Sequence, residues 1–254
     1  MRNVERWRPS KFVQVNGQWR PSSDQHELRR GSRFFASILC DLYPRLLKHH
    51  AKGRLLDHGC GKVPLYGMYR DLVREIVCID WSESFHGTEH VDQIVDLNGP
   101  LPFADESFDT ILSNDVMEHI KEPEIAWAEM ARVLRPYGKL ILSVPFLYGV
   151  HEVPYDYHRW TAFKLRAFCE ANGLNVLELQ PYGGGLEVVL DIVAKHLELH
   201  PVLSAIHLST ARLLRRIEAI KDSSERRKET FPIGYAMIAQ KTPSAIVSHE
   251  VGAG

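Results

Sequence analysis

Long apolar runs are absent from this sequence of 254 residues, and no stretch reaches the ~18 uncharged apolar residues that a membrane span needs. Residues 1–10 carry arginines with no apolar core behind them, so no secretory signal is predicted. The formal net charge is only −1, which disfavours a dedicated nucleic-acid binder. Cysteine is scarce and too widely spaced for a C-x-x-C motif, which indicates reduced thiols in a cytoplasmic protein, at Cys40, Cys60, Cys78 and Cys169.

What is present is a composition typical of a globular protein, with 44% apolar and 25% charged residues and no visible repeat or low-complexity tract. A chain of this length buries roughly three quarters of its unfolded surface, so it needs no disulfide or metal to hold its core. We therefore expect one large domain with added segments.

Short β-branched runs alternate with helical patterns from residue 54 onward, which is typical of a parallel sheet with helices on both faces. Helices are predicted at 64–73, 122–134 and 160–172, the last with Thr161 as N-cap and Gly173 as its stop. The expected fold class is α/β, with a doubly wound, mostly parallel sheet. Its seven strands are predicted at 54–57, 75–80, 93–97, 108–113, 139–144, 175–180 and 234–240.

Two segments lie outside the predicted core, which covers 53–183 and a last strand within 231–241. Residues 1–52 are expected to form a basic, aromatic cap over the ligand crevice, with an Asn-Gly hairpin and a helix from about residue 32 to 49. Residues 184–230 show two amphipathic patterns and are predicted to be a helical insertion, as a lid or a dimer face, with a membrane-surface helix as the alternative. Residues 242–254 have the composition of a loose tail.

The most informative stretch is the turn after the first strand, L-L-D-H-G-C-G-K-V-P at 55–64. Gly59 and Gly61 allow a tight turn and the close approach of a ligand, because they lack a Cβ. Asp80 ends the second strand, where a carboxylate can accept hydrogen bonds from ribose hydroxyls. A plain strand–helix turn with an N-capping aspartate fits the same pattern. A dinucleotide site needs a third glycine where Pro64 stands, so a nucleoside without phosphates fits better.

Three further motifs follow in order: D-L-N-G-P-L-P-F-A-D-E-S-F-D at 96–109, S-N-D-V-M-E-H at 113–119 and A-R-V-L-R-P-Y-G-K-L at 131–140. Together with the glycine turn they resemble the class I S-adenosylmethionine-dependent methyltransferases, specifically the type 11 branch. The resemblance covers about residues 52–181 plus the last strand, and it implies S-adenosyl-L-methionine as the cofactor. One departure is K-V-P at 62–64, where many relatives have another glycine.

The family's binding roles carry over to matching positions of this sequence. The resemblance implies that the methionine part of the cofactor meets Asp57, Gly59 and Gly61, and that the ribose meets Asp80. It further implies that Asp96 and Leu97 flank the adenine, with Asp96 near its amino group. Ser113 and Asn114, at the end of the fourth strand, are implied to line the floor beneath the sulfonium.

The loop after the fifth strand, residues 145–161, is dense in titratable and aromatic groups and is a candidate for the methyl-acceptor site. It is similar to the H-x-x-P-x-D-x-x-R-x-T pattern that borders the active site in part of the type 11 branch. Our hypothesis makes His151 the general base, while an internal Asp156–Arg159 salt bridge that only folds the loop is the alternative. The candidate catalytic residues are His151, Asp156 and His158, and the candidate substrate-binding residues are His119, Tyr155 and Arg159.

Two features of this region have other interpretations. His119 also fits a capping or packing histidine next to Glu118. No metal is predicted, because the spacing of His151, Glu152, Asp156 and His158 matches no known ligand signature.

The sequence thus predicts an S-adenosylmethionine-dependent methyltransferase that acts on a small molecule or a sugar-containing intermediate. Oxygen is favoured as the acceptor atom, because the loop offers a base and no acidic cluster attracts a cationic substrate. The alternatives are a catalytically silent cofactor-binding subunit of a hetero-oligomer and an NAD-dependent oxidoreductase. A nucleic-acid partner is disfavoured, and a homodimer could form through residues 184–230.

Overall fold

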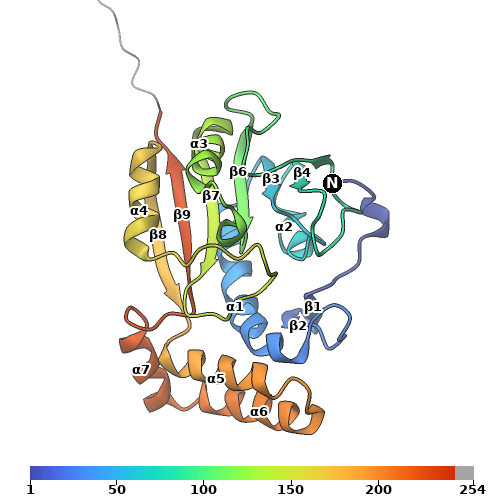
Figure 1. The fold of residues 1–254 in the computed structure, drawn as a ribbon, viewed down its shortest axis with the longest axis vertical. Helices are drawn as coiled ribbons and strands as arrows, with labels where there is room; N and C mark the ends of the chain where they lie inside the picture. Colours follow the sequence, from blue (N-terminus) through green and yellow to red (C-terminus); the bar gives the residue numbers. More distant parts are fainter. Residues whose placement is uncertain (244–254) are drawn as a thin grey trace, which may run out of the picture.

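A seven-stranded sheet runs through the computed structural model, which describes residues 1–243 (Figure 1). The strand order is β5-β4-β3-β6-β7-β9-β8, and β9 runs antiparallel to both of its neighbours, β7 and β8, whereas the other neighbouring strands pair in parallel. This arrangement confirms the predicted fold class. The strands are β3 (Arg54–His58), β4 (Glu75–Asp80), β5 (Gln93–Ile94), β6 (Phe108–Asn114), β7 (Leu134–Pro145), β8 (Leu174–Tyr182) and β9 (Gly234–Lys241).

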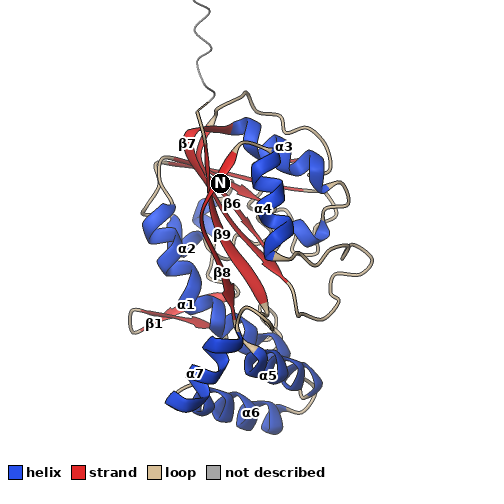
Figure 2. Cartoon of the chain, turned by 90° about the vertical axis from the view of Figure 1, so that its left-hand side faces the viewer, coloured by secondary structure: helices blue, strands red, loops and turns tan. Residues whose placement is uncertain are grey.

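Helices cover both faces of this sheet, with α1 and α2 on one side and α3 and α4 on the other (Figure 2). Each face has its own apolar core, and on the second face the rings of Trp127 and Phe168 stack with centroids 5.3 Å apart. The helices are α1 (Arg33–His50), α2 (Tyr66–Tyr69), α3 (Pro123–Val133), α4 (Ala162–Ala171), α5 (Gly185–His196), α6 (Pro201–Leu214) and α7 (Glu218–Arg227), with 3-10 turns η1 (Val4–Arg6), η2 (Arg30–Ser32) and η3 (Met117–His119).

The strand order reverses between β3 and β6, because the chain first moves outward to β4 and β5 and then returns to the other side of β3. In such sheets ligands bind outside the carboxyl ends of the strands at this reversal. The fold therefore places a binding crevice at the ends of β3, β4 and β6.

Two predicted elements are shorter in the structure than in the prediction. The third strand is reduced to Gln93–Ile94, and the helix predicted at 64–73 is the single turn of α2. Val63 adopts a left-handed φ of 51° immediately before Pro64, so the residues ahead of α2 form turns instead of helix. The helix predicted at 160–172 is confirmed as α4, with the Thr161 side chain accepting its capping hydrogen bond from the backbone of Lys164.

The N-terminal segment contains the predicted hairpin, formed by β1 (Phe12–Val15) and β2 (Gln18–Pro21). Asn16 and Gly17 at its turn have φ values of 50° and 75°, as a two-residue hairpin loop of this kind requires. Trp7 is buried, and its Nε1 donates a hydrogen bond to the carbonyl of Val63 at 3.1 Å. The segment thus braces the turn that follows β3.

The insertion at 184–230 contains three helices instead of two, because the second amphipathic pattern is broken between α6 and α7. The α6 face that packs on the protein includes Ser204 and Ala211, which are buried. Its apolar stripe lies outward, since Leu203, Ile206 and Leu213 are 50%, 56% and 62% exposed.

Three remaining predictions concern the termini, the membrane and the cysteines. The predicted tail at 242–254 lies almost entirely outside the described residues. Within residues 1–243, no helix has both the length and the apolar character needed to cross a bilayer. All four cysteines are buried free thiols.

Candidate active site

The turn after β3 depends on two glycines. Gly59 has a φ of +74°, and a Cβ at this position would lie 2.5 Å from Cγ2 of Val116. Its backbone N–H donates to the carbonyl of Ile79 on β4 at 2.9 Å, so the turn is held against the neighbouring strand. Gly61 has a φ of +51° and donates its N–H to Oδ2 of Asp80 at 2.7 Å. Only glycine fits the first position, because both the φ and the space exclude a side chain.

Asp80 ends β4 as a buried carboxylate at the mouth of the crevice. Besides the N–H of Gly61, it accepts hydrogen bonds from the N–H of Trp81 at 2.8 Å and the hydroxyl of Ser84 at 3.3 Å. Burial raises the pKa of Asp80, and these hydrogen bonds act against that rise. A carboxylate has about four lone-pair sites, so Asp80 can still accept hydrogen bonds from a ligand.

A cavity of about 220 Å³ opens at the predicted position, somewhat smaller than the roughly 300–1,000 Å³ of typical small-molecule sites. Among the described residues, neither the N-terminal cap (1–52) nor the helical insertion (184–230) contributes a side chain to the lining of this cavity. It is lined by Gly59, Asp80, Trp81, Ser84, Phe85, His86, Asp96, Leu97, Asn98, Asp115, Val116, His119, Ile120, Lys121, Glu152, Tyr155 and Tyr157.

The predicted cofactor residues fall into two sets. Those that line the cavity are Gly59, Asp80, Asp96 and Leu97. The other predicted residues do not line the cavity but hydrogen-bond to groups near it. Gly61 donates to Asp80, and Asp57 accepts a hydrogen bond from the Tyr69 hydroxyl at 2.6 Å. The Ser113 hydroxyl lies 3.3 Å from Nδ1 of His58, and Asn114 accepts a hydrogen bond from the Ser143 hydroxyl at 2.8 Å. Burial raises the pKa of Asp57 to about 7.

Asp156 and Arg159 organise the loop between β7 and α4. The guanidinium of Arg159 donates to both carboxylate oxygens of Asp156, at 2.5 and 2.7 Å, and Asp156 also accepts from the backbone N–H of His151. Burial alone would raise the pKa of Asp156, but these hydrogen bonds outweigh it and lower the pKa to about 2. Neither residue lines the cavity, so the structure favours the salt-bridge alternative over a catalytic Asp156 and a substrate-binding Arg159.

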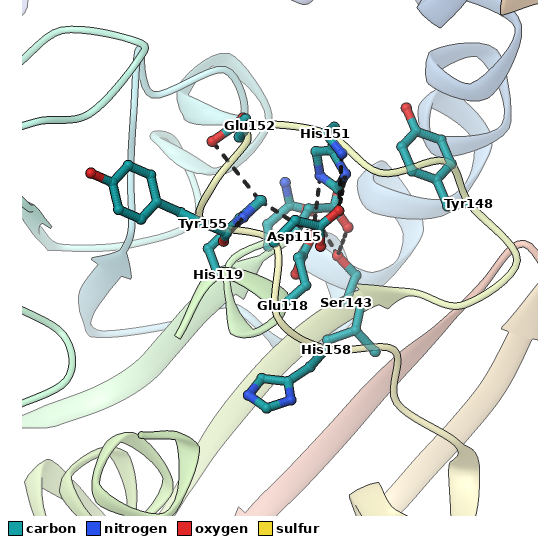
Figure 3. A network of polar contacts seen from close by, with 12 residues as sticks. Asp115, Glu118, His119, Ser143, Tyr148, His151, Glu152, Tyr155 and His158 are labelled. Atoms are coloured by element: carbon teal, nitrogen blue, oxygen red, sulfur yellow. Dashed lines mark hydrogen bonds and ion pairs between the residues drawn. The ribbon is translucent and has the colours of Figure 1, made fainter. Parts of the chain in front are cut away.

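The other predicted loop residues separate into two groups (Figure 3). Tyr155 lines the cavity, and its ring packs edge-on against Trp81 with centroids 4.8 Å apart. His158 does not line the cavity and points away from His119 and His151, and its ring centroid lies 4.5 Å from that of Trp160. This placement argues against the predicted catalytic role of His158, because its side chain is occupied by packing.

Glu118, His119 and His151 form a cluster beside the cavity (Figure 3), and we call these three residues the EHH cluster. Glu118 is 0% exposed, and its Oε1 lies 3.8 Å from Nε2 of His119 and 3.7 Å from Nε2 of His151. Burial raises the pKa of Glu118, with His151 acting against the rise. Of the three, only His119 lines the cavity, where it lies 3.9 Å from the Glu152 carboxylate.

Sequence reasoning missed Glu118 and several lining residues. Glu118 and His119 lie on η3 immediately after β6, and His151 follows β7. The two strands are parallel neighbours, with Asn114 paired to Ser143, so the segments that follow them meet at one edge of the sheet. That adjacency is the signal that could have found the EHH cluster. The missed lining residues include Trp81, Asn98 and Asp115.

Comparison with known proteins identifies a methyltransferase domain in part of the chain. Residues 56–142 match the family model described as "Methyltransferase domain", in its type 11 branch. These residues therefore carry a methyltransferase domain of the class I S-adenosylmethionine-dependent kind. Its cofactor is S-adenosyl-L-methionine, and the site fits this group: the backbone of Gly59 borders the cavity directly, and Asp80 lines it with acceptor capacity to spare.

Curated relatives match this chain over the cofactor-binding part. A demethylmenaquinone methyltransferase from Renibacterium salmoninarum is 33% identical over 95 residues, which cover 35% of this chain and 40% of the relative. A malonyl-(acyl-carrier protein) O-methyltransferase from Erwinia pyrifoliae is 33% identical over 107 residues, which cover 39% of this chain and 41% of the relative. The matches thus span about two fifths of the length of these relatives.

Solved structures resemble this chain over most of its length. The (4+2)-cyclase SpnF has a TM-score of 0.53 at 20% identity, with 82% of this chain and 83% of that chain covered. Phosphoethanolamine N-methyltransferase 2 from Haemonchus contortus, in complex with S-adenosyl-L-methionine, has a TM-score of 0.53 at 13% identity, with coverage of 85% and 56%. At these identities the similarity shows the fold alone.

Proposed function

We propose that this chain transfers a methyl group from S-adenosyl-L-methionine to a hydroxyl oxygen of a small molecule or a sugar-containing intermediate. The observation that carries the proposal is the EHH cluster, which adjoins the cavity at the carboxyl ends of β6 and β7. When bound, the cofactor supplies an electrophilic methyl group. A hydroxyl acceptor must lose its proton as the new bond forms, and the cluster offers two imidazoles for its activation.

The surrounding residues hold the acceptor side in place. His119 faces the cavity, and its Nδ1 lies 2.8 Å from the carbonyl of Tyr155, which fixes the orientation of the ring. His151 stands behind it, with ring centroids 4.8 Å apart, and the Asp156–Arg159 pair holds the backbone of His151. Such alignment of the reacting groups can supply several kcal/mol of the barrier.

Titration of S-adenosylhomocysteine by calorimetry tests the cofactor site. We expect micromolar binding to the wild type and a loss of at least about 100-fold in the Asp80→Ala variant, because each hydrogen bond to a charged group contributes about 1.5–3 kcal/mol. Asp71→Ala, at an exposed aspartate remote from the cavity lining, is the matched control and keeps the wild-type affinity. Binding of NADH in place of S-adenosylhomocysteine would favour an oxidoreductase instead.

The pH dependence of turnover tests the activation of the acceptor. Burial alone would lower the pKa of His151, but the adjacent Glu118 carboxylate outweighs this and raises it above 6.5. A protonated imidazole cannot activate a hydroxyl, so kcat/KM should rise with pH and level off above the ordinary histidine range. Glu118→Gln removes the negative neighbour and should move the midpoint to lower pH. A midpoint that stays in place in this variant would contradict the assignment.

A further inference from the structure

The carboxylate of Glu118 is an unusual buried group. It is 0% exposed, and neither of its oxygens has a hydrogen-bond partner in the described part of the chain. Burying an ionised carboxylate without partners is costly, and proteins compensate such a charge with a paired cation or a coordinated metal. The role of the Glu118 carboxylate therefore depends on the groups that face it.

Two imidazole nitrogens face the same space as this carboxylate. Nδ1 of His119 lies 2.8 Å from the Tyr155 carbonyl, and Nδ1 of His151 lies 3.2 Å from the Gly149 carbonyl and 3.2 Å from the Asp156 carboxylate. In a neutral ring, hydrogen bonds of this kind place the proton on Nδ1. Each Nε2 atom then carries a lone pair and no proton. Oε1 of Glu118 lies 3.8 Å from Nε2 of His119 and 3.7 Å from Nε2 of His151, so hydrogen-bond acceptors face one another with no proton to share.

We propose that the EHH cluster binds a divalent first-row transition-metal cation. Two imidazoles and one carboxylate are a donor set that such cations, Zn²⁺ among them, accept in proteins. The backbone carbonyls and Asp156 act as the outer partners that orient metal-binding histidines. This departs from the expectation from sequence, which weighed His151 together with Glu152, Asp156 and His158 and predicted no metal.

The geometry needs little adjustment for this role. The three donor atoms lie within 4.8 Å of one another. Two donors at about 2.1 Å from one ion are at most about 4.2 Å apart, so side-chain rotations that move atoms by less than about 1 Å are sufficient. The carboxylate of Glu152 lies 3.9 Å from Nε2 of His119, which is close enough for Glu152 to join the three residues as a further ligand.

A cation at this position would suit the proposed methyl transfer. This step of the inference therefore rests on the proposed function. His119 and Glu152 line the cavity, so open coordination positions face the space where an acceptor binds. With their Nε2 atoms on the cation, the two histidines would activate the acceptor hydroxyl through the metal and not as free bases. The cation would hold an oxygen of the acceptor there, which favours acceptors with a hydroxyl next to a second oxygen ligand. The substrate class inferred in this way is a chelating, oxygen-bearing small molecule.

Metal titration of the chelator-treated full chain tests the site without any turnover. Co²⁺ reports coordination through its visible absorption, and Zn²⁺ binding is followed by calorimetry. We expect one cation per chain, and a loss of affinity of at least about 100-fold in His151→Ala and in Glu118→Gln, because each removes one of three ligands. His196→Ala, at an exposed histidine of α5, is the control and binds as the wild type does.

Two results would overturn the inference: no stoichiometric binding of Co²⁺ or Zn²⁺ by the wild type, or full affinity in both ligand variants. In either case the cluster is an ion pair between a protonated histidine and Glu118. Circular dichroism and S-adenosylhomocysteine binding show that each variant is folded. Because that cofactor titration contains no added metal, loss of the cofactor site and loss of the metal site are measured separately.

Discussion

Gly59→Ala is expected to lower the free energy of unfolding by about 3 kcal/mol and to abolish cofactor binding. The left-handed φ of +74° costs about 1–2 kcal/mol for a residue with a Cβ, and the contact at 2.5 Å with a Val116 methyl adds an overpacking cost of about 1–3 kcal/mol. The turn that holds Asp80 must shift to relieve that contact, which removes the cofactor site. Urea denaturation and S-adenosylhomocysteine calorimetry measure the two effects.

Gly87 provides the matched control for this variant. Its φ is +76°, and no atom lies within 4 Å of the position that a Cβ would take. Gly87→Ala should therefore show the backbone cost alone, about 1–2 kcal/mol. Adding Val116→Ala to Gly59→Ala should relieve the overpacking part of the loss. Equal destabilisation by the two glycine variants would mean that the contact with Val116 is unimportant.

His151→Ala is expected to reduce turnover at least tenfold, because a positioned activating group contributes roughly 10²–10⁴ in rate. The affinity for S-adenosylhomocysteine should stay unchanged, since His151 does not line the cavity. Turnover with the identified acceptor and cofactor calorimetry separate the two quantities. His196→Ala is the control and should retain wild-type turnover. Full activity of His151→Ala would exclude this residue from the activation of the acceptor.

The fold was largely predictable because its signals are local. Strand patterns that alternate with helices identify a parallel sheet, and the Asn16-Gly17 pair identifies the hairpin. The predictions from sequence were wrong where tertiary contacts override the local sequence pattern. The left-handed Val63 shortens α2, and the apolar stripe of α6 faces outward although its periodicity suggests a packing face.

The cofactor side of the site was also predictable, because its residues follow strands in a fixed order. The acceptor side was predicted only in part. Histidines are visible as potential bases in a sequence, but the complete burial of Glu118 without a partner is a property of the folded chain. Likewise, the Asp156–Arg159 pair can be suspected from its spacing, but only the structure shows that it holds the backbone of His151.

The position of β9 has a consequence for the synthesis of this chain. Within the described sheet, β8 pairs only with β9, which lies between it and β7. During translation, β8 and the three helices that follow it leave the ribosome before β9 is made, so the open edges of β7 and β8 have to wait for their partner. Unpaired strand edges promote association between chains. The nascent protein is therefore most exposed to aggregation until residue 241 has emerged, when β9 completes the described sheet.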